Sequence, residues 1–165
     1  MNTPFPPHVL PVEPRHAYRL LNTGASVLVS SAHAGRRDVM ACAWNVALEF
    51  EPPKLAVCLD KATLTRELVE ASGSFVVAVP RAAQADLVAT VGSVSGRDVA
   101  GQDKFSAFHI RHAPGTQVDA PLVEGCIGWL ECRLIPKPHL QQAHDLFIGQ
   151  AVATWADERA FAHGK

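Results

Sequence analysis

The stretch DKATLTRE, from Asp60 to Glu67, places an ammonium group and two hydroxyl groups around the expected start of a helix. These groups belong to Lys61, Thr63 and Thr65. The first turn of a helix has unpaired backbone N–H groups and a partial positive charge, so this combination suits an anion such as a phosphate. The alternative is a capped helix with a solvated lysine. On this stretch alone the alternative is favoured, because helix caps are common.

A second polar stretch, SVSGRDVAGQDKF, runs from Ser93 to Phe105 and is rich in glycine. It carries two cationic side chains, Arg97 and Lys104. A loop of this kind could wrap a phosphate or could simply turn a corner, and its sequence alone leaves both interpretations open.

Common catalytic signatures are absent from the sequence. There is no GxGxxG or GxxxxGK[ST], and GSVSG has Val94 where a nucleophilic serine would stand. His139 and His144 are five residues apart, a spacing that does not place them on one helical face. No metal site is therefore predicted.

The composition indicates one globular domain. The chain has 165 residues, 48% of them hydrophobic, and a net charge of −1, which argues against a nucleic-acid-binding protein. Residues 1–15 are expected to form an extended Pro-rich arm, and residues 16–165 a single domain. The N-terminal sequence lacks the pattern of a signal peptide, and no apolar run is long enough to cross a bilayer.

The four cysteines have no CxxC spacing, and we interpret them as buried thiols in a reducing compartment. We therefore expect a cytoplasmic protein that does not associate with membranes.

The remaining elements follow from apolar periodicity and turn residues. Strands are expected over residues 25–32, 39–48, 54–60, 74–80, 124–140 and 144–157, with short helices over 63–72 and 82–92. Thr63 is a candidate N-cap and Gly73 a candidate helix stop. Residues 93–118 are expected to form a loop with one helical turn. Several turn-bounded strands with two inserted helices predict a mainly β fold, a small β-barrel.

The strand expected at 39–48, VMACAWNVAL, has side chains that are small for a core strand. This strand and several segments that follow it resemble the flavin reductase-like family, whose members bind FMN on a split β-barrel. The segments are MACAWNVALEFEPP, TLTRELVEASGSFVVAVP, SGRDVAGQDKF, APLVEGCIGWLECRL and HDLFIGQAV, in the family's order between about Ala25 and Thr154. Within the family the sequence is most similar to the flavoredoxin-like branch.

The resemblance implies a set of FMN-binding residues, with FAD as the alternative flavin. The set comprises Met40, Ala41, Cys42, Ala43, Trp44 and Asn45 along the flavin ring, Lys61, Thr63 and Thr65 at the phosphate, and Ser95, Gly96, Arg97, Lys104 and Phe105 in the loop. It also places His144 near the open face of the flavin, as the candidate catalytic residue. A structural or solvent-facing histidine is the alternative.

The resemblance further implies an enzyme, an NAD(P)H-dependent flavin oxidoreductase that passes electrons from NADH or NADPH through flavin to a downstream acceptor. A flavoredoxin-type FMN electron carrier without direct nicotinamide activity is the alternative. Family members are typically homodimers, so we expect a homodimer, with a redox partner protein as a further candidate partner. The chemistry of the reaction would come from the flavin, which the protein positions.

Overall fold

A computed structural model describes residues 25–101 and 103–160. The predicted arm, residues 1–15, lies outside the described residues. Within them, the elements are β1 (Val27–His33), β2 (Arg36–Cys42), β3 (Asn45–Phe50), β4 (Pro53–Cys58), α1 (Leu64–Ser72), β5 (Ser74–Val79), the short 3₁₀ helix η2 (Ala82–Gln84), α2 (Ala85–Ser93), α3 (Lys104–Ala107), β6 (His112–Ala113), β7 (Leu122–Val123), β8 (Gly128–Ile135), α4 (Pro138–His144) and β9 (Leu146–Ala156).

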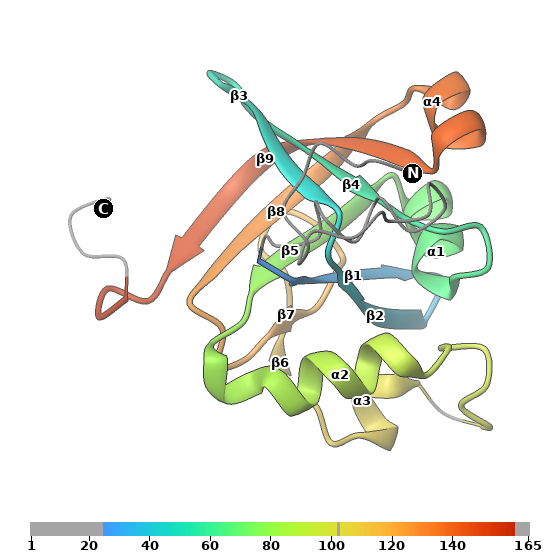
Figure 1. Cartoon of the computed structure of the whole chain (residues 1–165), viewed down its shortest axis with the longest axis vertical. Helices are drawn as coiled ribbons and strands as arrows, with labels where there is room; N and C mark the ends of the chain where they lie inside the picture. The colour runs from blue at the N-terminus through green and yellow to red at the C-terminus, as the bar shows by residue number, and fades with distance from the viewer. Residues whose placement is uncertain (1–24, 102, 161–165) are drawn as a thin grey trace, which may run out of the picture.

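The main sheet has seven strands in the order β2-β1-β5-β8-β9-β4-β3, and every neighbouring pair is antiparallel. β2 and β3 follow each other in the chain but form opposite edges of the sheet. The sheet therefore curls so that its two edges approach each other, as Figure 1 shows. β6 and β7 form a separate two-stranded sheet.

The predicted strand over residues 39–48 is broken at Ala43 and Trp44 into β2 and β3. β2 stays paired with β1 as far as Cys42, which lies opposite Val27 at the start of β1. Beyond that point the chain crosses to β4, where the Cys58 amide donates to the Trp44 carbonyl at 3.0 Å. A run of small apolar residues does not reveal a change of partner strand, so the sequence predicted one continuous strand.

The predicted strand over residues 124–140 is shorter than expected. β8 ends at Ile135, and the segment from Pro138 begins α4 instead. Proline cannot donate to a strand ladder but is favoured in the first turn of a helix, which explains the change of structure here.

The two largest hydrophobic cores of the described residues lie on opposite faces of the sheet. Phe75, Phe147 and Val57 are fully buried in the larger core, to which six of the seven main strands contribute. The smaller core joins the other face of β1, β2 and β5 to α2 and α3, with Phe105 among its members. Figure 1 shows α2 and α3 on this side of the sheet and α1 near α4. No helix of the described ranges, 25–101 and 103–160, is long and apolar enough to span a bilayer.

Candidate functional site

A cavity of about 220 Å³ lies between β2, the start of α1, the end of α2 and the loop that follows α2. Six of the residues predicted to bind a flavin line this cavity. They are Met40, Ala41, Thr63, Ser95, Gly96 and Lys104. These residues come from three separate parts of the sequence, so the fold assembles them in one place.

The two polar stretches, residues 60–67 and 93–105, meet at this cavity. Thr63 caps α1: its hydroxyl accepts from the Arg66 amide at 3.3 Å and donates to the Asp60 carbonyl at 2.8 Å. The helix ends at Gly73, which has φ of 68° and adopts the left-handed conformation that glycine tolerates. The predicted helix and both predicted caps are confirmed.

Thr65 and Lys61, the neighbours of Thr63, point elsewhere. Thr65 is fully buried, and its hydroxyl donates to Asp38 Oδ2 at 2.7 Å. The Lys61 side chain is exposed, with Nζ 4.0 Å from Asp145 Oδ1. The local geometry is thus that of a capped helix with a solvated lysine, and the phosphate role of Lys61 and Thr65 stays a prediction.

A buried ion pair lies beneath the cavity. Asp38 Oδ1 is 3.7 Å from Lys104 Nζ, and the lysine also donates to the carbonyls of Val39 and Val91 at 2.9 Å each. Burial raises the pKa of Asp38, against the opposing effect of Lys104, and lowers the pKa of Lys104. Asp38 Oδ1 has no hydrogen-bond partner among the described residues.

Gly96 covers this ion pair. A Cβ atom at Gly96 would lie 2.5 Å from Asp38 Oδ1, so only glycine fits at this approach. Gly92 is also close-packed, because a Cβ there would lie 3.1 Å from the Cβ of Ala41. Small residues on both sides of the cavity let the backbone approach a ligand closely.

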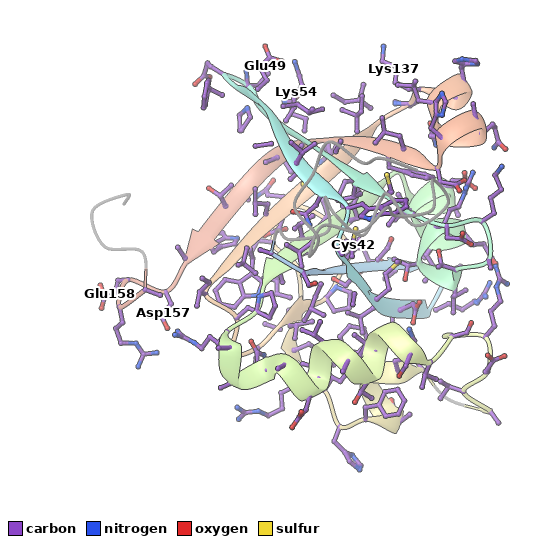
Figure 2. All side chains as sticks on the ribbon, in the orientation of Figure 1. Cys42, Glu49, Lys54, Lys137, Asp157 and Glu158 are labelled. Carbon is purple, nitrogen blue, oxygen red and sulfur yellow. The ribbon has the colours of Figure 1, made fainter. Side chains whose placement is uncertain are left out.

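The other predicted ring-binding residues lie around the crossing from β2 to β3. Cys42 is buried near the centre of the molecule, as Figure 2 shows, and burial raises the pKa of its thiol to about 11. It is therefore protonated and unreactive at neutral pH. The Asn45 side chain donates to the carbonyls of Ala25 and Cys42 at 3.0 and 3.1 Å, which fixes the crossing. Ala43 is half-buried and Trp44 is exposed.

The remaining predicted residues lie outside the cavity. Phe105 is buried, with the Arg37 guanidinium 5.1 Å from its ring centre. His144 is exposed at the end of α4, and its ring meets that of His139 edge-on at 6.5 Å. A flavin-contacting role for Phe105 or His144 stays a prediction.

A second cavity, of about 560 Å³, adjoins the first and shares Leu64 and Gly96 with it. Three arginines line it: Arg36, Arg37 and Arg97. Arg97 is among the residues predicted from the sequence, and Arg36 and Arg37 are not. In the sequence these two arginines are adjacent in HAGRRD, between the strands expected over residues 25–32 and 39–48.

The residues present fit a flavin with a phosphorylated side chain. The first cavity offers small residues for close approach and the hydroxyls of Thr63 and Ser95, and the second offers cations.

Comparison with known families agrees with these features. The model of the flavin reductase like domain matches residues 18–164. The chain belongs to the flavin reductase-like family. An uncharacterized Escherichia coli protein, YddH, is 43% identical over 159 residues, covering 94% of this chain and 82% of its own length.

Two relatives have named activities. The reductase subunit HsaB of a flavin-dependent monooxygenase from Mycobacterium tuberculosis is 30% identical over 110 residues, 67% of this chain and 54% of that protein. A flavin reductase (NADPH) from Lentzea aerocolonigenes is 26% identical over 143 residues, 87% of this chain and 79% of that protein.

Solved structures share the fold. An FMN-binding domain of a flavin reductases-like enzyme from Shewanella baltica has a TM-score of 0.82 and 48% identity, covering 93% of this chain and 80% of that one. The flavoredoxin of Desulfovibrio vulgaris has a TM-score of 0.74 and 30% identity, covering 84% and 73%. The predicted family and the predicted fold, a mainly β split barrel of the FMN-binding type, are confirmed.

Proposed function

We propose that this member of the flavin reductase-like family binds FMN and uses NADH or NADPH to reduce it, passing the electrons to a downstream acceptor. The observation that carries the proposal is the cavity beside β2, where six residues predicted from the family resemblance converge. The relative named as an NADPH flavin reductase supports the nicotinamide as reductant.

The residues of the chain have binding and positioning roles in this proposal. The Ser95 hydroxyl would donate to the polar side chain of the flavin. The Thr63 hydroxyl, whose proton is donated to the Asp60 carbonyl, would accept from that side chain, and Gly96 would let the loop backbone approach it. Met40 and Ala41 would lie toward the ring. When bound, FMN would supply the electron-transfer chemistry, which needs no acid–base pair from the protein.

The test is anaerobic reduction of the purified, FMN-loaded protein. Mixing with NADH or NADPH in a stopped-flow instrument should bleach the flavin absorption within the time of catalytic turnover, and comparison of the two identifies the preferred nicotinamide. Failure of both to bleach bound FMN would contradict direct nicotinamide activity. The variant His144→Gln tests the candidate catalytic residue in the same assay.

A second candidate function is that of a flavoredoxin-type FMN electron carrier. The structural likeness to a flavoredoxin at 30% identity supports it. In this case FMN binds, neither nicotinamide bleaches it directly, and bleaching requires a redox partner protein. The same assay, with and without a reducing partner, separates the two functions.

We also propose a homodimer that acts in the cytoplasm. Apolar side chains exposed along β3, from Val46 to Phe50, offer a surface for a second copy. The four cysteines are free thiols, which supports a reducing compartment.

A further inference from the structure

One carboxylate joins two of the three arginines beside the candidate flavin site. Glu67, in the first turn of α1, accepts from Arg36 Nη1 at 2.6 Å through Oε1. Its other oxygen, Oε2, lies 2.8 Å from Arg97 Nη2. Arg36 belongs to β2 directly after the β1–β2 turn, and Arg97 to the loop after α2, so Glu67 ties together two segments that border the cavity.

The two guanidinium groups keep unused donors in this arrangement. Arg97 Nε donates to the Ala62 carbonyl at 3.3 Å, which leaves Nη1 without a partner among the described residues. Arg36 makes no side-chain hydrogen bond other than that to Glu67 within residues 25–101 and 103–160. Both side chains are about half exposed, so an incoming ligand could reach them.

The chemical character of the lining changes from the first cavity to the second. The first presents apolar and small residues of β2, then the hydroxyls of Thr63 and Ser95. Past Gly96, which both cavities share, the second cavity presents guanidinium groups. A flavin has the same order along its length: an apolar ring, a polyol chain and, in FMN, a terminal phosphate.

The charges near the second cavity favour an anion. Arg37 is occupied by Asp103, with Nε 2.9 Å from Oδ2. Arg36 and Arg97 share the single carboxylate of Glu67, which leaves one positive charge in excess among these three residues. Hydrogen bonds from Arg36 and then Arg97 hold the pKa of Glu67 below its usual range, so the carboxylate is ionised at neutral pH.

We propose that Arg36 binds the phosphate of the flavin, and that Glu67 holds Arg36 and Arg97 in place until that phosphate displaces it. The inference rests on the proposed function, because it assigns a further residue to the same flavin site. A phosphate offers more oxygen acceptors than a carboxylate and carries more charge, so it competes well for paired guanidinium groups.

The test compares FMN with riboflavin, which has the same ring and polyol chain but no phosphate. Arg36→Gln should raise the Kd of FMN about tenfold, because it removes a charge-assisted contact, and change the Kd of riboflavin by less than about twofold. Arg111→Gln is the matched control. Arg111 is exposed, its Nε lies 3.4 Å from Glu124 Oε2, and it lines neither of the two cavities. Flavin fluorescence quenching gives each Kd.

Glu67→Gln gives a prediction of the opposite sign. Loss of the competing carboxylate should lower the Kd of FMN about threefold and leave that of riboflavin unchanged, because one negative charge leaves the phosphate site. Glu70→Gln, one turn along the same helix and paired with Arg66 rather than Arg36, should change neither Kd. Thermal unfolding of each variant checks that it is folded.

The outcomes separate this inference from the proposed function. If the wild-type protein binds neither flavin, both fail. If it binds FMN and all variants keep the wild-type ratio of FMN to riboflavin affinity, only the role of Arg36 is overturned. If Arg36→Gln leaves the Kd of FMN unchanged but slows flavin reduction by NADPH more than by NADH, the phosphate role of Arg36 is also overturned. The arginine would then be assigned to NADPH binding.

Discussion

Lys104 and Asp38 form the polar centre beneath the candidate flavin site. Both side chains are almost fully buried, and the lysine also binds backbone carbonyls of β2 and α2. The pair therefore fixes the distance between the strand and the helix that border the cavity. A buried ion pair of this kind contributes little net stability when complete, but loss of one partner leaves an uncompensated charge.

Lys104→Met should lower the free energy of unfolding by about 3–5 kcal/mol, since Asp38 would remain buried without its partner. The double variant Asp38→Asn with Lys104→Met should recover much of this loss. Urea denaturation of the wild type, both single variants and the double variant measures the coupling. Additive losses in the double variant would show that the two side chains do not act as a pair.

Some of the predicted site residues line the cavity, and some residues of the cavity were not predicted. The family resemblance predicted Ser95, Gly96 and Lys104 as flavin-binding residues, and all three line the cavity although they are far from Met40 in the chain. Asp38 was missed, because an isolated aspartate next to a turn has no distinguishing pattern until its burial is known. Thr65 was grouped with Lys61 by sequence proximity, whereas Thr65 lies in α1 and is buried, and Lys61 lies in the turn before α1 and is exposed.

The strand β8 and the loop before β7 are joined by another buried carboxylate. Glu131 accepts from the amides of Thr116, Gln117 and Val118, from the Thr116 hydroxyl and from the Trp155 indole. Burial alone would raise the pKa of Glu131, but these donors outweigh it and the pKa is lowered. The carboxylate replaces the partners that the loop amides would otherwise find in water.

Glu131→Gln should destabilise the protein by about 1–3 kcal/mol at pH 7, because a neutral amide cannot accept from all these donors. The sign of the pH dependence follows from the lowered pKa. The carboxylate stabilises the fold fully above the usual pKa of 4.5, and this stabilisation declines as the pH falls toward the lower pKa of the folded state.

Denaturant unfolding of wild type and Glu131→Gln at several pH values tests this. The difference in unfolding free energy should be constant above about pH 6 and shrink below about pH 4.5. A difference that grows on acidification would contradict the assignment of the ionised carboxylate as the acceptor.

Most elements were predictable where the chain carries its own boundary signals. Thr63 and Gly73 mark the two ends of α1, and Ala34 and Gly35, with φ of 49° and 78°, form the tight turn between β1 and β2. The β2–β3 break and the start of α4 were not predicted. Strand partners depend on residues far away in the sequence, and the prolines near Pro138 permit either a strand end or a helix start.

β3 is an edge strand of the main sheet, and its apolar side chains are exposed in the folded molecule. Phe50 is 98% exposed at the tip of the β3–β4 hairpin, where Figure 2 also places Glu49 and Lys54, and Val46 and Leu48 are at least half exposed. Three exposed apolar side chains on an edge strand are suited to the contact with a second copy that we propose.

Phe50→Asp combined with Leu48→Asp should therefore dissociate the proposed homodimer into monomers, since each charge would have to be buried without a partner. Sedimentation velocity over a range of concentrations reports the change, and Glu49→Gln on the same hairpin is the control. A wild-type protein that is monomeric at all concentrations would contradict the proposed homodimer, and a double variant that remains dimeric would place the interface elsewhere.

We propose the cavity between β2 and the loop after α2 as the flavin site, and FMN titration of the wild type and Gly96→Ala tests this assignment. A Cβ at Gly96 would meet Asp38 Oδ1 at 2.5 Å and push the loop away from β2. Gly128→Ala is the control, because its Cβ would make an ordinary contact at 3.4 Å.

We expect the wild type and Gly128→Ala to quench FMN fluorescence alike, and Gly96→Ala to bind about tenfold or more weakly, as a misplaced loop costs about 1–3 kcal/mol. Equal FMN affinity in all three proteins would contradict a flavin site at this cavity. Failure of the wild type to bind FMN would contradict a flavin site altogether.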